Sequence, residues 1–153
     1  KYIASAPRII PRISNPKFFI IVRLNLINRN IEEFIKNLKS ILASVSYSIS
    51  KTKEGYHHSN VHLILKMLGF DIISEEETNI GRIDAVIKFT SIIYILEFKF
   101  DNSSDSSKSA LNQIKEKKYY EKFISDKKDI IAIGIGFSDT EKNISGFSHE
   151  RIE

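Results

Sequence analysis

The chain has 153 residues, of which 42% are hydrophobic and 27% charged, as expected for one globular domain with its own core. It contains no cysteine, which excludes a disulfide framework and a cysteine-based zinc site, and its apolar runs are too short to cross a bilayer. The net charge of +4 is compatible with a polyanionic partner. We expect a soluble, cytoplasmic protein, and the abundance of Ile, Lys, Asn and Ser suggests a bacterial one.

Residues 1–29 form the part of the chain whose structure is hardest to predict. Three prolines favour an extended arm with turns, and the apolar run over 17–27 fits either a strand or a buried helix. From Asn30 the pattern is clear, because Asn30 followed by Glu33 resembles a capping box and apolar residues then recur at helical spacing to residue 47. We therefore expect an N-terminal arm over 1–29 and a single domain over 30–153, which begins with a helix over 30–47.

The rest of the chain alternates between helices and strands. Because a helix is expected between two of the strands, we expect a right-handed crossover and hence a mixed sheet with helices on its faces. The elements expected in chain order are a helix over 54–68 ended by Gly69, strands over 70–77, 82–89 and 92–100, a polar loop over 101–109, a helix over 110–124, a strand over 129–137, and an edge strand within 142–153.

The strand over 129–137 has no polar face after Asp129, so we expect both of its faces to be buried. Gly134 and Gly136 alternate with isoleucines and therefore line one face of the sheet. We expect a helix to pack closely on these glycines, and we do not interpret them as a phosphate-binding loop.

Two strands in the middle of the chain each carry an acid. If Thr90 and Ser91 form a two-residue hairpin loop, Asp84 lies directly opposite Glu97, with Cβ atoms about 4.5–5.5 Å apart. Lys99 lies two residues beyond Glu97 and therefore points to the same face. A four-residue loop keeps this register, whereas a three-residue loop would place the two acids on opposite faces.

Two facing carboxylates destabilise a hairpin unless their charge is compensated. A shared proton, the neighbouring Lys99 or a divalent cation would each compensate it. With a metal, Asp84, Glu97 and Lys99 suit phosphodiester hydrolysis, because the lysine can hold the attacking water or stabilise a developing anion. Without a metal, the same residues are the surface-facing end of a hairpin with a simple Glu–Lys pair, and spacing by itself does not decide between these interpretations.

The segments "GRIDAV" and "YILEFKF" resemble the D…ExK signature of the PD-(D/E)xK nuclease superfamily. Further segments, from "EGYHHSNVHLILKMLGFDIISE" to "IIAIGIGFS", resemble in the same order the branch of this superfamily that is often found C-terminal to an AAA-ATPase-like region. The resemblance extends from Asn30 to the C-terminus. It implies an α/β fold with a restriction-endonuclease-like core, in which helices flank a mixed central β-sheet.

The resemblance also implies roles for individual residues. Asp84 and Glu97 match the metal-binding acids, and Glu54 matches an acid that completes the metal site in many relatives. Lys99 matches the lysine that orients water and steadies the transition-state charge, and Gln113 matches a glutamine often placed next to the site. The implied cofactor is Mg²⁺ or Mn²⁺, and the implied substrate is nucleic acid, DNA rather than RNA.

Lysines crowd into residues 108–128, which is typical either of a nucleic-acid-binding surface or of a solvated helix face. Lys117 and Tyr120 are predicted to share one helical face with Gln113, at i+4 and i+7, where they would contact phosphate or simply pack and solvate that face. Arg82 is expected to approach the nucleic-acid backbone. Nothing resembles a base-reading element, so we expect little sequence specificity.

Glu54, His58 and His62 are spaced by four residues and share one face of the predicted helix. They fit a transition-metal site, but there is no HExxH pattern, so we favour a second interpretation in which His58 lines the groove near Glu54 and meets phosphate. His62 is expected to be a satisfied surface or core histidine. The related branch commonly has a tyrosine where His57 stands.

Two other functions stay open beside a metal-dependent nuclease. The fold is also compatible with a catalytically inactive module that binds nucleic acid or protein. The missing initiator methionine suggests a module of a larger bacterial protein, either an ATPase-linked protein or an effector or toxin delivered into a host cell. The intact Asp84, Glu97 and Lys99 favour the nuclease.

Overall fold

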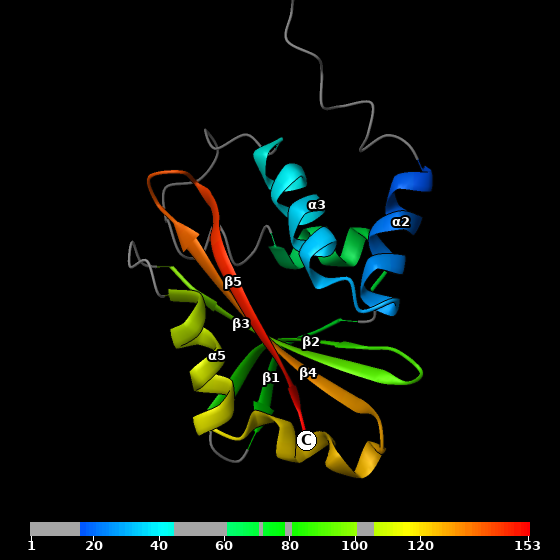
Figure 1. The fold of residues 1–153 in the computed structure, drawn as a ribbon, viewed down its shortest axis with the longest axis vertical. Helices are drawn as coiled ribbons and strands as arrows, with labels where there is room; N and C mark the ends of the chain where they lie inside the picture. Colours follow the sequence, from blue (N-terminus) through cyan, green and yellow to red (C-terminus); the bar gives the residue numbers. More distant parts are fainter. Residues whose placement is uncertain (1–15, 45–60, 71, 79–80, 101–105) are drawn as a thin grey trace, which may run out of the picture.

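The computed structural model of the chain describes residues 16–44, 61–70, 72–78, 81–100 and 106–153 (Figure 1). None of the helices within these ranges is long and apolar enough to cross a membrane. The helices are α2 (Pro16–Ile27), α3 (Ile31–Ala43), a helix over 61–67, α5 (Ser106–Glu116) and the 3-10 helix η2 (Tyr119–Asp126), and the strands are β1 (Ile72–Thr78), β2 (Gly81–Lys88), β3 (Ile92–Lys99), β4 (Asp129–Ser138) and β5 (Asn143–Ile152).

The five strands form one mixed sheet in the order β1-β2-β3-β4-β5. Neighbouring strands are antiparallel except β3 and β4, which are parallel because α5 and η2 carry the chain back across the sheet between them. The mixed sheet with flanking helices is therefore confirmed, and β5 is the edge strand that the tail of the sequence predicted.

Helices cover both faces of this sheet (Figure 1). On one face, α2, α3 and the helix over 61–67 pack against alternate residues of β3 such as Tyr94 and Leu96. On the other face, α5 and η2 pack against the intervening residues Ile93 and Ile95. Because successive residues of a strand point to opposite faces, Glu97 belongs with Ile93 and Ile95 on the α5 side.

Specific hydrogen bonds fix the start of α3 and attach α2 to the sheet. Asn30 caps α3, since its side chain accepts a hydrogen bond from the Glu33 N–H at 3.3 Å, as the capping pattern predicted. The sequence of residues 17–27 fits either a strand or a buried helix, and the structure shows a helix. Its core-facing residue Leu26 has a backbone carbonyl that accepts a hydrogen bond from the buried Tyr94 hydroxyl, so α2 is tied to the sheet. Residues 45–47 of the predicted leading helix lie outside the described residues.

The helix predicted over 110–124 is wrong as a single element. Helix α5 begins earlier, at Ser106, and ends at Glu116, and Lys118 adopts a left-handed conformation with φ 49° before η2 starts. A helix does not continue through a left-handed residue, so the helix axis changes at this point. The early start has a packing reason, because the side chains of Ser106 and Ser107 are buried against β4 and are small enough to fit there.

Gly134 allows this close approach of α5 to the sheet, as the glycine pattern predicted. A Cβ atom at Gly134 would lie 2.2 Å from the Ser107 carbonyl oxygen and 2.5 Å from the Leu111 nitrogen. Both neighbours are backbone atoms of α5, so the helix as a whole would have to move. The distance between α5 and β4 is therefore set by the missing side chain.

We expect Gly134→Ala to destabilise the protein by about 3 kcal/mol or more, because relieving the contact requires α5 to shift away from β4. Urea unfolding followed by circular dichroism measures this. Gly146→Ala on β5 is the matched control, since its Cβ would meet Ser107 Oγ at an ordinary 3.7 Å and should cost far less. Equal stability of the two variants would show that the close approach is not a constraint.

Candidate active site

The hairpin of β2 and β3 has the register that the two-residue loop predicted. Paired residues run from Lys88 opposite Ile93 to Ala85 opposite Leu96, and the Phe89 N–H donates to the Ile92 carbonyl at 2.8 Å. The paired residues end there, one residue before Asp84 and Glu97. Asp84 accepts a hydrogen bond from the N–H of Phe98, the residue after Glu97, so the two acids still lie close together.

Asp84 is held where the backbone pairing of β2 with β3 ends. Its Oδ2 atom accepts a hydrogen bond from the Phe98 N–H at 2.8 Å, so the carboxylate takes the place of a backbone acceptor. The side chain is half-buried and is fixed next to Glu97.

Glu97 is the buried member of the pair, with only 4% of its surface exposed. Its Oε1 atom accepts a hydrogen bond from Gln113 Nε2, and its buried Oε2 atom has no hydrogen-bond partner among the residues that the structure describes. The pKa of Glu97 is raised to about 8, first by burial and then by the charge of Asp84, while Lys99 and a hydrogen bond with the backbone of Asp84 lower it. A buried carboxyl group with one oxygen that lacks a hydrogen-bond partner among the described residues is suited to bind a proton or a cation.

Gln113 connects the acids to the lysine. It lies on α5 and accepts a hydrogen bond from Lys99 Nζ at 2.6 Å through its Oε1 atom, while its Nε2 atom donates to Glu97. One amide thus bridges Glu97 and Lys99, which share a face of β3 because they are two residues apart. The structure therefore brings together Asp84, Glu97, Lys99 and Gln113 of the predicted site residues.

Other predicted residues lie outside this cluster. Glu54 and His58, together with His57, lie outside the described residues, so their part in the site stays a prediction. His62 is buried and packs edge-on against Phe98, with ring centroids 6.1 Å apart, in the core on the opposite side of the sheet from Glu97. Within the described ranges, no group of three or more potential metal ligands is found.

The predicted common face of Gln113, Lys117 and Tyr120 is wrong for Tyr120. Lys117 keeps its position one turn after Gln113, since its N–H donates to the Gln113 carbonyl at 2.9 Å. The left-handed Lys118 then turns the chain, and Tyr120 lines a separate hollow together with residues of β5. Tyr119 lies beside Gln113 instead, and Gln113 Nε2 donates to its hydroxyl at 3.4 Å.

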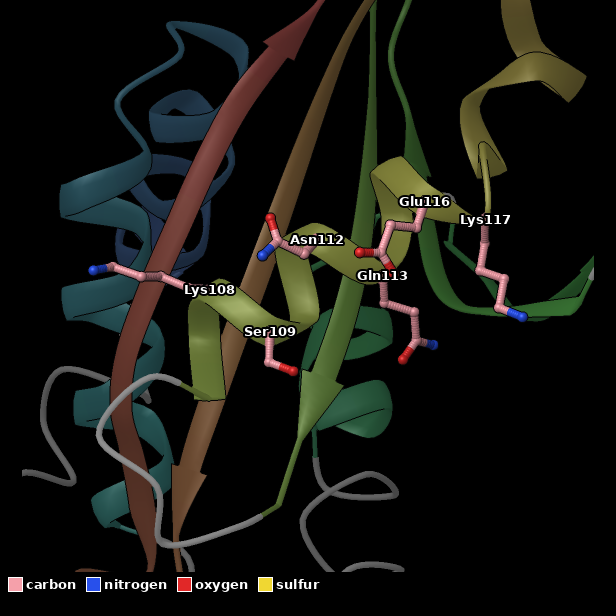
Figure 2. A pocket seen from close by; sticks show the side chains of 6 residues that line it. All are labelled: Lys108, Ser109, Asn112, Gln113, Glu116 and Lys117. Atoms are coloured by element: carbon pink, nitrogen blue, oxygen red, sulfur yellow. The ribbon is translucent and has the colours of Figure 1, made fainter.

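A hollow of about 560 Å³ runs along the exposed side of α5 (Figure 2). Gln113 lines this hollow and also contacts Glu97 and Lys99, so this one side chain borders both the hollow and the site. Lys108 and Lys117 stand at its opposite ends. The residues that line it are all polar: Lys108, Ser109, Asn112, Gln113, Glu116 and Lys117.

Arg82 is exposed on β2, two residues before Asp84. Its neighbours Gly81 and Ile83 face the core under α5 and η2, because a Cβ atom at Gly81 would meet Tyr119 and Ile83 packs with Tyr119 in that core. Arg82 therefore points to the other face of the sheet, and its contact with the nucleic-acid backbone stays a prediction. Lys117 follows the end of α5, one turn after Gln113, and is the cation on the α5 side whose position suits a polyanion near the carboxylates.

The carboxylates fit a hard divalent cation. Oxygen ligands from acids are those that Mg²⁺ and Mn²⁺ prefer, and Glu97 offers a buried oxygen that lacks a partner among the described residues. A cation next to Asp84 and Glu97 would also remove the repulsion that raises the pKa of Glu97. The described part of the site supplies two such ligands, and the sequence predicts Glu54 as a third.

The chain belongs to the PD-(D/E)XK nuclease superfamily, whose family model matches residues 52–147. It is also similar to an uncharacterized protein encoded in the vnfD 5′ region of Azotobacter chroococcum mcd 1, with 32% identity over 99 residues, or 65% of this chain. The aligned part spans 19% of that relative, so this chain corresponds to about a fifth of its length. No solved structure matches.

The family assignment confirms the resemblance on which the α/β restriction-endonuclease-like fold was predicted. Members of this superfamily are commonly nucleases that use divalent metals, so a nuclease-like function and a nucleic-acid substrate follow at that level. The placement in the ATPase-linked branch stays a prediction.

The raised pKa of Glu97 predicts that the stability of the metal-free protein depends on pH. Its carboxyl group holds a proton up to about pH 8 when folded but releases it near pH 4.5 when unfolded. The folded state therefore binds more protons between these values, and the free energy of unfolding should fall by on the order of a few kcal/mol as the pH rises through this window. Urea midpoints measured in EDTA from pH 4.5 to 8.5 check this.

Glu97→Gln should flatten this dependence, because the glutamine does not titrate. Glu141→Gln, on the exposed turn between β4 and β5, is the matched control and should keep the slope of the unmodified protein. The same slope in Glu97→Gln as in the control would contradict the assignment of the dependence to Glu97.

Proposed function

We propose that the chain is a metal-dependent nuclease that hydrolyses phosphodiester bonds of nucleic acid, DNA rather than RNA, with little sequence specificity. The observation that carries this proposal is the Asp84–Glu97 pair, linked through Gln113 to Lys99 and containing a buried oxygen without a partner among the described residues. A lone Glu–Lys pair at a hairpin end needs neither the bridging glutamine nor the burial.

Asp84 and Glu97 would hold Mg²⁺ or Mn²⁺, with Glu54 as a supporting ligand. The cation, when bound, supplies charge neutralisation at the phosphate and a water that is more easily deprotonated. The carboxylates hold that cation on one side of the hairpin, and the hydrogen bond from the Phe98 N–H keeps Asp84 from turning away. Helix α5 covers Glu97 and excludes bulk water from it. The lower local dielectric constant strengthens the interaction of Glu97 with a cation.

Lys99 would orient the attacking water and stabilise the negative charge that develops on the phosphate. Its ammonium group has three N–H donors, and Gln113 occupies one of them. The other donors extend towards the same face as the carboxylates. Gln113 thereby fixes the direction of Lys99, which preorganises the charge instead of leaving a flexible lysine to find its position.

The substrate would be bound through its backbone. Lys117 follows α5 one turn after Gln113, and none of the described residues that line the hollow along α5 is aromatic, so the hollow offers no platform for stacking bases. His58, which lies outside the described residues, is proposed to approach a phosphate. Such contacts recognise phosphate charge and carry no sequence information.

An inactive binding module is the alternative function. One observation favours a module. The part of the relative that aligns with this chain is 19% of its length, so other segments contribute to the function of that relative. Nothing in the cluster of Asp84, Glu97 and Lys99 favours the loss of catalysis, because all three groups that hydrolysis requires are present and adjacent.

A cleavage assay tests the proposed function. The purified chain should cut plasmid or single-stranded DNA with Mg²⁺ or Mn²⁺ and should not cut in EDTA. Lys99→Ala and Glu97→Gln should each lower the rate at least about 100-fold, because each removes a group that acts on the transition state. Lys36→Ala, on an exposed position of α3 on the opposite side of the sheet, is the control and should cut at the full rate.

Metal-dependent cutting that persists in both Lys99→Ala and Glu97→Gln would locate the activity elsewhere. Absence of cutting by the folded, unmodified chain, together with retained binding of nucleic acid, would favour the inactive module.

Binding should depend on salt in a way that identifies the phosphate contacts. In a Glu97→Gln background, a logarithmic plot of the DNA association constant against salt should become shallower by about 1 when Lys117 is replaced by alanine. Fluorescence anisotropy with labelled DNA of two unrelated sequences measures this. Lys36→Ala should leave the slope unchanged, and an equal effect of the two changes would argue against a defined binding path.

A further inference from the structure

Tyr119 is the first residue of η2, and it is a buried side chain whose polar end reaches the candidate site. Only 3% of its surface is exposed, and its ring packs in the core with Ile114 and Phe123. Its hydroxyl accepts a hydrogen bond from Gln113 Nε2 at 3.4 Å. Tyrosine at this position therefore combines a packing role with a contact that phenylalanine would lack.

The hydroxyl occupies space that Gly81 leaves open. A Cβ atom at residue 81 would lie 3.0 Å from the Tyr119 hydroxyl oxygen and 3.3 Å from Cε1 of the same ring. Gly81 begins β2, three residues before Asp84, so the tyrosine closes the gap between the start of that strand and α5. Burial raises the pKa of Tyr119, the hydrogen bond with Gln113 lowers it, and the charges of Glu97 and Asp84 raise it.

All polar atoms of the Gln113 amide are engaged through this arrangement. One N–H donates to Glu97 Oε1, the carbonyl oxygen accepts from Lys99 Nζ at 2.6 Å, and the second N–H is directed to the Tyr119 hydroxyl. Without that hydroxyl the amide keeps only its hydrogen bonds to Glu97 and Lys99, so its plane is less tightly fixed. A tilt would move the two groups that Gln113 connects.

We propose that Tyr119, seated against Gly81, is a positioning residue that holds the Gln113 amide and through it the relative positions of Glu97 and Lys99. The proposal rests on the proposed nuclease function for its kinetic consequences, but the contact itself is independent of that function. Tyr119 acts through Gln113 and is not itself required to touch the substrate.

Tyr119→Phe tests the proposal, with Tyr120→Phe as the matched control in the separate hollow beside β5. We expect Tyr119→Phe to lower kcat about 5- to 10-fold, the effect of losing one neutral hydrogen bond, with KM for DNA and the thermal midpoint nearly unchanged. Tyr120→Phe should keep the full kcat. A packing role alone would lower the midpoint without separating kcat from KM.

A second measurement does not depend on cleavage. In ¹H–¹⁵N spectra, the side-chain NH₂ signals of Gln113, assigned through loss of the signals in Gln113→Glu, should move in Tyr119→Phe and stay in place in Tyr120→Phe. Gly81→Ala should move the same signals, since its Cβ displaces the tyrosine.

Unmoved Gln113 signals in Tyr119→Phe, or equal kcat in the two phenylalanine variants of an active enzyme, would overturn the positioning role. If the unmodified chain does not cut DNA but the Gln113 signals move as expected, the positioning role stands and the nuclease function fails.

Discussion

Glu97 carries a carboxyl group on a strand that is buried on both faces, close to the second carboxylate of Asp84. Burial and the charge of Asp84 both oppose ionisation, so the folded protein retains an electrostatic conflict at this one position. Packing alone does not explain such a residue, because an apolar side chain at this position would avoid the free-energy cost of burying a charge. The conflict is resolved by a proton, or by a cation that binds both acids, and the rest of the site is arranged around it.

The site also depends on how closely α5 approaches the sheet. Gln113 reaches both Glu97 and Lys99 only because α5 lies directly on β4, and α5 lies there because Gly134 has no side chain and Ser107 has a small one. A larger residue at either position would lift the helix and its glutamine away from β3. Residues without any chemical role thus set the distances between those that have one.

The two faces of the sheet have different functions. The face under α2, α3 and the helix over 61–67 carries most of the apolar core, which includes the aromatic contacts between Phe98, Phe137 and His62. The face under α5 has a smaller core, and the acid pair lies on this face. The large core supports the strands, so the site on the other face can retain buried polar groups.

The sequence by itself determined the order of elements, the hairpin register and the meeting of Asp84 with Glu97, since these follow from local periodicity and the two-residue turn. It did not determine where α5 ends, because the left-handed Lys118 has no clear local signal, and for the same reason it indicated Tyr120 where Tyr119 meets Gln113. The link from Glu97 through Gln113 to Lys99 was decided only by tertiary structure. It joins residues of a strand and a helix whose separation depends on packing against β4, and packing distances are not encoded in the spacing of residues along a chain.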